Sequence, residues 1–167
     1  MYIRSEQSGD EDQIREVHLQ AFETVMEANL VDALRDAGIE LISLVAVDGE
    51  EIIGHILFSP MTIDAPLRIM GLAPMAVLPS RQRQRVGSQL VEAGLKACAQ
   101  AEFDAVVVLG HPSYYPRFGF EPAAAFGIKS EYDVPSEVFM LKELKPGVLR
   151  GISGTVEYHP AFAADEP

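Results

Sequence analysis

The sequence predicts an α/β protein whose central sheet is flanked by helices. Helical and strand patterns alternate along the chain, and Asp48-Gly49, between two apolar runs, is typical of a tight hairpin turn. A run rich in valine at 103–109 follows a helical segment, as in a β-α-β crossover that buries its last strand on both faces. The hairpin predicts an antiparallel pair of strands, and the crossover indicates an α/β core.

The first half of the chain divides into a short strand, two helices and the hairpin. Residues 1–4 are expected to form the strand, and the turn Ser8-Gly9-Asp10 precedes a helical stripe that predicts a helix over about 10–22. A second stripe ends at Gly38, a residue suited to the left-handed conformation that often terminates helices. The hairpin strands are then expected at 41–47 and 52–59, with Pro60 ending the second.

The second half carries a deformed strand and a closely packed helix. The apolar segment 67–77 contains Gly71 and Pro74, and both fit a bulge or a locally unpaired position better than a regular ladder. The helix predicted over 86–101 has small side chains on one face, which permits close packing. The remaining elements are a helical turn at 113–118 closed by Gly119, strands at 138–144 and 154–158, and a mostly irregular segment at 122–135.

Composition excludes several classes of function. The chain of 167 residues has 13 Lys plus Arg against 25 Asp plus Glu, and the resulting net charge of −12 disfavours nucleic acid and anionic membranes as partners. Its uncharged stretches are shorter than the ~20 apolar residues of a membrane span. The N-terminus lacks a basic start followed by an apolar run, so a cytoplasmic location is expected. A single cysteine, Cys98, provides neither a disulfide nor a cysteine zinc site, and no metal is predicted.

The segment from Val77 to Ser88 is predicted to bind an anion. It joins a strand to the start of a helix and holds three arginines in a protein that is otherwise acidic. Unpaired N–H groups and the dipole at a helix N-terminus attract phosphate, and Gly87 allows it to approach the backbone. An ordinary solvated basic turn is the alternative. Neither G-x-G-x-x-G after the first strand nor a Walker sequence is present, which disfavours nucleotide-binding folds of those types.

Two blocks of sequence resemble the GNAT superfamily of acyl-CoA-dependent N-acetyltransferases. The first is Leu72-Ala73-Pro74-Met75-Ala76-Val77-Leu78-Pro79 followed by Gln82-Arg83-Gln84-Arg85-Val86-Gly87, which is similar to the family's strand four and its Q/R-x-x-G-x-G/A pyrophosphate loop. The second is Gly110-His111-Pro112-Ser113-Tyr114-Tyr115-Pro116-Arg117-Phe118-Gly119-Phe120, similar to the family's Tyr-x-x-x-Gly-Phe block. The resemblance covers about residues 2–145 and implies one GNAT domain over 1–167, with C-terminal strands and a tail at 146–167.

The resemblance implies a GNAT fold, in which a mixed, mostly antiparallel sheet is splayed between strands four and five. Acetyl-CoA would bind as co-substrate in that cleft, its pantetheine beside the strand as if it were an added strand. The N–H group near Met75 would then polarise the thioester carbonyl. The residues implied for cofactor binding are Met75, Ala76, Val77, Gln82, Arg83, Gln84, Arg85, Val86, Gly87 and Ser88.

Two departures from the family pattern bear on coenzyme A binding. Arg85 stands where the loop's first glycine is usual, and it would crowd a pyrophosphate only if the backbone there needed a positive φ. We expect an ordinary φ, with Arg85 in the first helical turn. The family's frequent asparagine after strand five is also missing, because Gly110-His111-Pro112 occupies that loop.

The implied reaction is direct attack of a neutral amine on the thioester in a ternary complex. Tyr115, four residues before Gly119, is the implied general acid for the departing thiolate, since a phenol is protonated at neutral pH. The general base stays open among His55, His111, Glu27 and water. Cys98, on the small-residue face of its helix, is expected to be a buried structural thiol.

The leading functional prediction is therefore an N-acetyltransferase acting on an unidentified small-molecule or peptide amine. The alternative is a non-catalytic GNAT-like acyl-CoA-binding regulatory module, suggested by Arg85 and by the absence of Asp and Glu from 67–77. The acceptor pocket is expected to draw on residues 27–34 and 126–135. A homodimer would be usual for the family, although the sequence has no interface signature.

Overall fold

The computed structural model describes residues 1–165, and its main sheet has seven strands. The strands of the protein are β1 (Tyr2–Ser5), β2 (Ile42–Asp48), β3 (Glu51–Met61), β4 (Ile69–Val77), β5 (Ala105–Leu109), β6 (Glu121–Pro122), β7 (Ile128–Ser130), β8 (Phe139–Glu143) and β9 (Gly154–Val156). The sheet order is β1-β2-β3-β4-β5-β8-β6, and only the β4–β5 pair is parallel within it. A second, two-stranded sheet pairs β7 with β9. The predicted mixed, mostly antiparallel sheet is confirmed.

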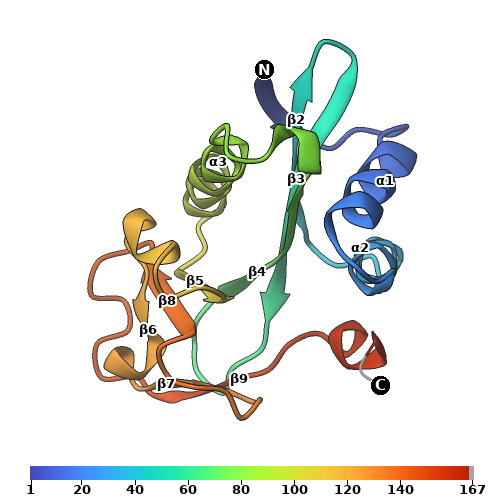
Figure 1. Cartoon of the computed structure of the whole chain (residues 1–167). Coiled ribbons are helices and arrows are strands. Elements are labelled where there is room, and N and C mark those ends of the chain that lie inside the picture. The colour runs from blue at the N-terminus through green and yellow to red at the C-terminus, as the bar shows by residue number, and fades with distance from the viewer. Residues whose placement is uncertain (166–167) are drawn as a thin grey trace.

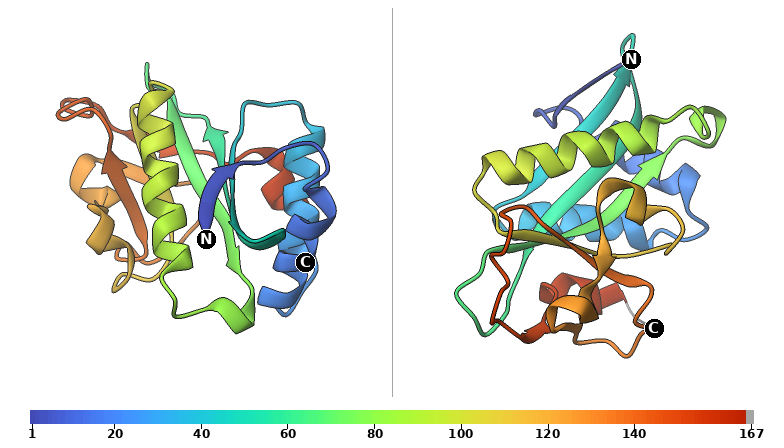
Figure 2. Two further views of the ribbon diagram at one scale, coloured as in Figure 1. Left: turned by 90° about the horizontal axis from the view of Figure 1, so that it is seen from above. Right: turned by 90° about the vertical axis from the view of Figure 1, so that its left-hand side faces the viewer.

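Helices cover both faces of the main sheet. The longer helices are α1 (Glu11–Ala21), α2 (Met26–Asp36) and α3 (Val86–Gln100), and the short 3-10 helices are η1 (Pro79–Arg81), η2 (Tyr115–Phe118), η3 (Ala123–Phe126) and η4 (Pro160–Asp165). Figure 1 shows α1 and α2 on one side of the sheet and α3 on the other, and the view from above in Figure 2 shows the same three layers. Within residues 1–165, no helix combines the length and apolar character that crossing a bilayer requires.

The hairpin between β2 and β3 forms as predicted, but β3 continues beyond Pro60. Gly49 has the positive φ that the turn needs, and Asp48 pairs with Glu51. Pro60 is paired with Met70 inside the strand, so the expectation that it ends the strand is wrong. The register explains why: β2 begins opposite Phe58, and beyond that point β3 pairs with β4 alone. A proline on such an open edge sacrifices no ladder hydrogen bond.

The β4 strand separates from β5 after three residues. Pairing joins Ile69–Gly71 to Ala105–Val107 and does not extend further. On its other side β4 pairs with β3, where Ile56 lies opposite Met75 and Phe58 lies opposite Leu72. Between these two pairs β4 has one residue more than β3, so the register shifts by one residue. This places the predicted bulge at Pro74, whose bond to Ala73 is cis. Gly71, in contrast, lies in the regular ladder, so the bulge expectation for Gly71 is wrong.

The small-residue face of α3 packs directly on the sheet. A Cβ atom at Gly94 would overlap the ring of the fully buried Phe58. Gly54 of β3 likewise leaves room for Leu90 and Val86, which would lie 3.1 Å from a Cβ there. Cys98 is completely buried on the same helix, and burial raises the pKa of its thiol to about 12. Cys98 is therefore buried, as expected of a structural thiol.

The segment 122–135 has more structure than its sequence indicates. It contributes to the short strand β6, the helix η3 and the strand β7. β6 pairs with β8, while β7 pairs in parallel with β9, about 26 residues further along the chain. The prediction of an irregular segment fails because distant partners, rather than local propensity, stabilise strands of two or three residues.

Candidate active site

The loop between β4 and α3 is folded back on itself by short local contacts. η1 follows Leu78 directly, and the N–H group of Arg81 donates to the carbonyl of Leu78 at 2.8 Å. The side-chain amide of Gln82 donates to the carbonyl of Val77 at 3.1 Å and closes the loop against the end of β4. The chain then enters α3, whose first internal bond runs from the Gln89 N–H to the Arg85 carbonyl. The N–H groups of residues 86–88 precede that bond and have no partner within the helix.

Two arginines of this loop adopt the left-handed conformation. Arg83 has a φ of 64° and Arg85, at the N-cap of α3, a φ of 66°. The expectation of an ordinary φ at Arg85 is therefore wrong. Left-handed residues in a loop can turn neighbouring N–H groups toward one concave side, as in anion-binding nests, and a positive φ explains the family's glycine at the position. Here a residue with a Cβ adopts it.

The conformation of Arg85 gives a test of the local backbone. An arginine in the left-handed region costs about 1 kcal/mol relative to glycine. We therefore expect Arg85→Gly to raise the free energy of unfolding by up to about 1 kcal/mol, as measured by urea denaturation. Lys96→Gly, in the interior of α3, is the matched control and should instead lower stability by about 1 kcal/mol. Destabilisation by Arg85→Gly would show that Arg85 does not have a positive φ.

A cleft of about 390 Å³ lies where the loop, β4 and α3 meet. We call it the cradle. Its lining consists of Met75, Ala76, Val77, Arg81, Gln82, Arg83, Arg85, Val86, Gly87, Ser88, Tyr114 and Arg117. Nine of the ten residues proposed for cofactor binding line it. The tenth, Gln84, does not, because its side chain accepts a hydrogen bond from Arg81 at 3.3 Å.

Three residues of the cradle, Arg81, Tyr114 and Arg117, are not among the ten residues implied for cofactor binding, although Arg81 lies in the segment 77–88 predicted to bind an anion. Arg81 lies in the basic loop, and its guanidinium is 2.6 Å from the carboxylate of Asp48. That contact holds the pKa of Asp48 below its usual range and fixes Arg81 at the cradle wall. Tyr114 and Arg117 belong to the second sequence block, but no sequence signal separates Tyr114 from its neighbour Tyr115.

The cradle carries positive charge that is not neutralised locally. Arg83 and Arg85 are both exposed, and neither forms an ion pair with any residue in 1–165. The free N–H groups at the start of α3 and the helix dipole add to this field. Positively charged side chains beside backbone N–H groups without hydrogen-bond partners are the arrangement that binds phosphate.

The two adjacent tyrosines have different surroundings. The hydroxyl of Tyr114 lies 3.0 Å from that of Ser88 at the cradle wall. Tyr115 does not line the cradle; its ring packs edge-on against Tyr114 and Phe120, with centroids 5.0 and 5.7 Å away. Burial, with a smaller contribution from Tyr114, raises the pKa of Tyr115 to about 12. Its phenol is therefore protonated at neutral pH.

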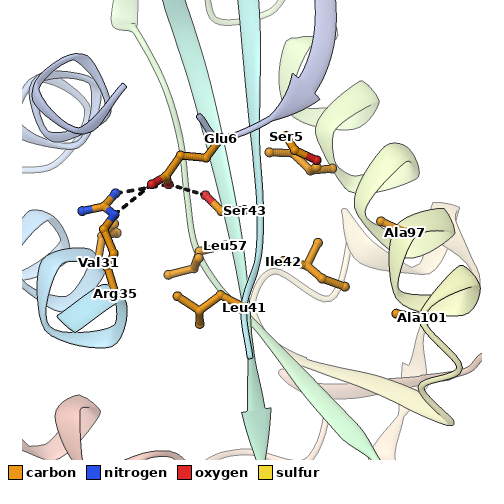
Figure 3. A pocket seen from close by; sticks show the side chains of 11 residues that line it. Ser5, Glu6, Val31, Arg35, Leu41, Ile42, Ser43, Leu57, Ala97 and Ala101 are labelled. Atoms are coloured by element: carbon orange, nitrogen blue, oxygen red, sulfur yellow. Dashed lines mark hydrogen bonds and ion pairs between the residues drawn. The ribbon is translucent and has the colours of Figure 1, made fainter. Parts of the chain in front are cut away.

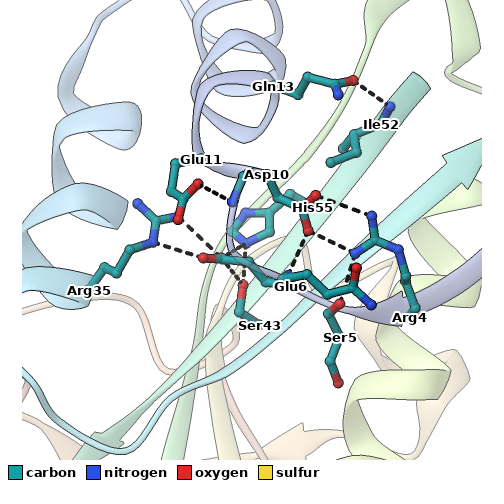
Figure 4. A network of polar contacts seen from close by, with 12 residues as sticks. Arg4, Ser5, Glu6, Asp10, Glu11, Gln13, Arg35, Ser43, Ile52 and His55 are labelled. Carbon is teal, nitrogen blue, oxygen red and sulfur yellow. Dashed lines mark hydrogen bonds and ion pairs between the residues drawn. The ribbon is translucent and has the colours of Figure 1, made fainter. Parts of the chain in front are cut away.

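His55 is buried within a polar chain on the helix α1 side of the sheet (Figure 4). Arg35 donates to both carboxylate oxygens of Glu6, and Glu6 also accepts a hydrogen bond from the hydroxyl of Ser43 at 2.6 Å. The oxygen of Ser43 must then accept from Nε2 of His55 at 2.8 Å, and Nδ1 of His55 accepts from Nε2 of His18 at 2.8 Å. Both ring nitrogens of His55 are occupied, as expected of a structural strand histidine rather than a base.

The other two base candidates have no special environment. His111 is exposed, and its carbonyl caps the turn by accepting from the N–H groups of Tyr114 and Tyr115. The carboxylate of Glu27 accepts from the hydroxyl of Thr24 at 3.0 Å. None of the three side chains lines the cradle, so the general base remains unassigned.

The buried histidines make stability depend on pH. His18 is fully buried, and the resulting desolvation, aided by the charge of Arg35, lowers its pKa to about 4; His55 is shifted in the same direction. As the pH falls, the histidines of the unfolded chain take up protons near pH 6.5, whereas those of the folded protein do so only at lower pH. The contribution of the buried histidines to the free energy of unfolding is therefore fully present above pH 6.5 and is lost as the pH falls toward 4. For His18 alone the loss is about 3 kcal/mol. We measure the free energy of unfolding in urea at pH 7.5 and at pH 5. The difference between the two pH values should be smaller in His18→Leu than in the wild type or in the exposed control His111→Gln.

The expected acceptor segments line separate cavities. Of the expected residues 27–34, Val31 lines a cavity of about 370 Å³ at the edge of β2 that β1 leaves uncovered, next to Arg35 (Figure 3). The segment 128–136 lines a different cavity, of about 430 Å³, together with Ala124 and Phe139. The location of the acceptor pocket therefore stays a prediction.

Comparison with known proteins identifies the family. The sequence profile described as an acetyltransferase (GNAT) domain matches residues 2–123, most of the chain. The chain belongs to the GNAT acetyltransferase family. The uncharacterized N-acetyltransferase YhbS of Escherichia coli K12 is 37% identical over 164 residues, which are 97% of this chain and 98% of YhbS. The predicted family and the assignment as an acyltransferase enzyme are confirmed.

Two solved GNAT structures resemble the whole molecule. The crystal structure of E. coli YhbS in complex with CoA superposes with a TM-score of 0.93 at 36% identity, covering 97% of this chain and 91% of that one. A GNAT acetyltransferase from Brucella melitensis in complex with acetyl-CoA has a TM-score of 0.81 at 34% identity, with 96% and 97% covered. The predicted GNAT fold, splayed between β4 and β5, is confirmed.

Proposed function

We propose that this GNAT enzyme transfers the acetyl group of acetyl-CoA to a primary amine by direct attack in a ternary complex. The observation that carries the proposal is the cradle, in which free N–H groups, left-handed backbone and unpaired arginines surround one cleft beside the splayed strands. The two structural relatives above contain CoA and acetyl-CoA, respectively. Membership of an acetyltransferase family favours an enzyme over a binding module.

The residues of the cradle fit the parts of acetyl-CoA. Residues 82–88 would bind the diphosphate through N–H groups and arginines. Because β5 no longer covers β4 beyond Gly71, the β4 edge at residues 75–77 is available for the amides of pantetheine. Pro74 contributes no N–H group, and the N–H near Met75, the next residue, is proposed to polarise the thioester carbonyl.

Tyr115 is the proposed proton donor. The amine must attack as the free base, and its lone pair displaces coenzyme A from the acetyl carbon. The departing sulfur then takes the phenolic proton of Tyr115, which the raised pKa keeps on the oxygen until donation. The acylated nitrogen loses one proton, and this proton returns through solvent to the tyrosinate and restores the phenol. Tyr115 lies behind Tyr114 at the cradle wall, and the two rings are in contact, so the proposed donation requires a side-chain movement that brings the phenol to the cleft.

The acceptor is proposed to be a cationic small molecule or peptide amine. The net charge of −12 attracts such amines toward the protein, while the basic cradle holds the anionic donor. A location in the cytoplasm, a single domain over 1–167 and a homodimer stay predictions.

Thiol release tests the proposed function. The protein is mixed with acetyl-CoA and a panel of amines that includes polyamines, amino-sugar compounds and peptides with free N-termini. We expect free coenzyme A and acetylated amine to form in equal amounts with at least one class of amine. Tight binding of acetyl-CoA without release for any amine would instead favour the non-catalytic module.

A further inference from the structure

A chain of hydrogen bonds attaches helices α1 and α2 to the main sheet. It consists of His18 of α1, His55 of β3, Ser43 of β2, Glu6 in the link between β1 and α1, and Arg35 of α2. Figure 4 shows the part of the chain that runs from His55 to Arg35. Because the chain joins five parts of the fold, a change in one of its bonds acts on the contact between the two helices and the sheet.

The hydrogens of this chain have one arrangement. The hydroxyl of Ser43 donates to Glu6, so its oxygen accepts from Nε2 of His55. Nδ1 of His55 then accepts from Nε2 of His18, which leaves Nδ1 of His18 without a hydrogen. This Nδ1 is the one buried side-chain nitrogen or oxygen in residues 1–165 that has no hydrogen-bond partner. The chain therefore ends at an acceptor that no donor reaches.

The closed arrangement cannot accommodate a further proton. A proton on Nδ1 of His18 would create an N–H group that faces no acceptor. A proton on Nδ1 of His55 would place two N–H groups against each other across 2.8 Å. If the hydrogen of His18 moved from Nε2 to Nδ1 to relieve that conflict, the same unpaired N–H group would result. A buried charged donor without an acceptor is strongly unfavourable, so the structure has to open before either histidine is protonated.

The charged groups around the two histidines do not supply the missing acceptor. Glu6 lies 4.0 Å from Nε2 of His55, but both of its oxygens already accept from Arg35. Asp32 of α2 favours protonation of His18, but its oxygens accept from two arginines. The charge of Arg35 opposes protonation of both histidines. The strand β4, which also packs against α1, contains no titratable side chain.

Helices α1 and α2 belong to one continuous segment, residues 10–37, on the face of the sheet opposite to α3 (Figure 1). The cradle takes none of its lining from this segment. Segments of this kind open as units in many proteins, with a lower free energy than global unfolding. We propose that the His18–His55 pair is a pH-sensitive switch, in which a proton on either histidine releases residues 10–37 from the sheet while α3 keeps its place. This inference does not depend on the proposed function.

Hydrogen exchange at pH 7.5 and pH 5, corrected for the intrinsic effect of pH on exchange, tests the switch. Burial lowers the pKa of His18 to about 4, whereas an exposed histidine titrates near 6.5. The open population should therefore rise about 30-fold between the two pH values for one histidine. We expect the amides of α1 and α2 to lose protection by at least that factor. At pH 5 they should exchange at least about tenfold faster than the slowest amides of α3.

The double variant His18→Gln/His55→Gln is the matched control. Each glutamine offers one donor and one acceptor, as a neutral histidine does, but takes up no proton. Exchange in α1 and α2 should then lose its dependence on pH, whereas His111→Gln, which changes an exposed histidine, should behave as the wild type.

Three results would overturn the switch, and two of them need only the wild type. In the first, protection of α1 and α2 is the same at pH 7.5 and pH 5. In the second, all three helices are equally protected at pH 5, which means that residues 10–37 open only when the whole molecule unfolds. In the third, the dependence on pH persists in the folded double variant, so other groups cause it.

Discussion

Replacing Gly87 by aspartate is expected to weaken coenzyme A binding by about 100-fold or more without unfolding the protein. A Cβ atom at Gly87 would be 3.6 Å from the Tyr114 hydroxyl and 3.7 Å from a Met75 methyl group, so it fits without a clash. Both neighbours line the cradle, which means that the new carboxylate would occupy the position proposed for the diphosphate. The carboxylate would repel the negatively charged diphosphate and would also prevent its contacts with the backbone N–H groups.

Folding and binding can be separated at this position. An acidic residue in the first turn of a helix is favourable, so Gly87→Asp should melt at or near the wild-type temperature. Gln89→Asp is the matched control, because it adds the same charge to the same turn at an exposed residue outside the cradle. Calorimetry should find coenzyme A affinity little changed in Gln89→Asp. Equal losses in both variants would mean that long-range charge, rather than the site itself, governs binding.

The parts of the site that the sequence predicts well are those specified locally. Three features depend only on residues that are neighbours in the sequence: the hairpin at Asp48-Gly49, the face of α3 formed by small side chains, and the basic loop. Each is found where it was expected. The bulge at Pro74 is similar, since a residue without an N–H group cannot complete a ladder. Family resemblance added the identity of the ligand, which spacing and composition alone left as an unspecified anion.

Other features depend on contacts that no local pattern encodes. Glycine signals a left-handed backbone, but an arginine gives no such signal, so the conformation of Arg83 and Arg85 could not be predicted. Which of two neighbouring tyrosines faces the cradle depends on packing against Phe120 and Ser88, residues from different elements. The β7–β9 pair likewise depends on partners far apart in the chain.

Tyr115→Phe is expected to lower kcat by about 100-fold while coenzyme A affinity stays unchanged. The substitution removes only the hydroxyl, for which no hydrogen-bond partner exists within residues 1–165. The ring contacts with Tyr114 and Phe120, which hold η2 in place, remain. A thiolate is already a tolerable leaving group, so losing the donor should slow the reaction without abolishing it. Single-turnover measurements isolate this chemical step from product release.

Tyr114→Phe provides the comparison that identifies the donor. Tyr114 lines the cradle and its hydroxyl meets Ser88, so its loss should affect coenzyme A affinity more than the chemical step. The two variants therefore differ in which constant changes, kcat for Tyr115 and Kd for Tyr114. If Tyr114→Phe instead slows the single-turnover rate and Tyr115→Phe does not, the proton comes from the tyrosine already at the cradle wall, and the movement proposed for Tyr115 is unnecessary.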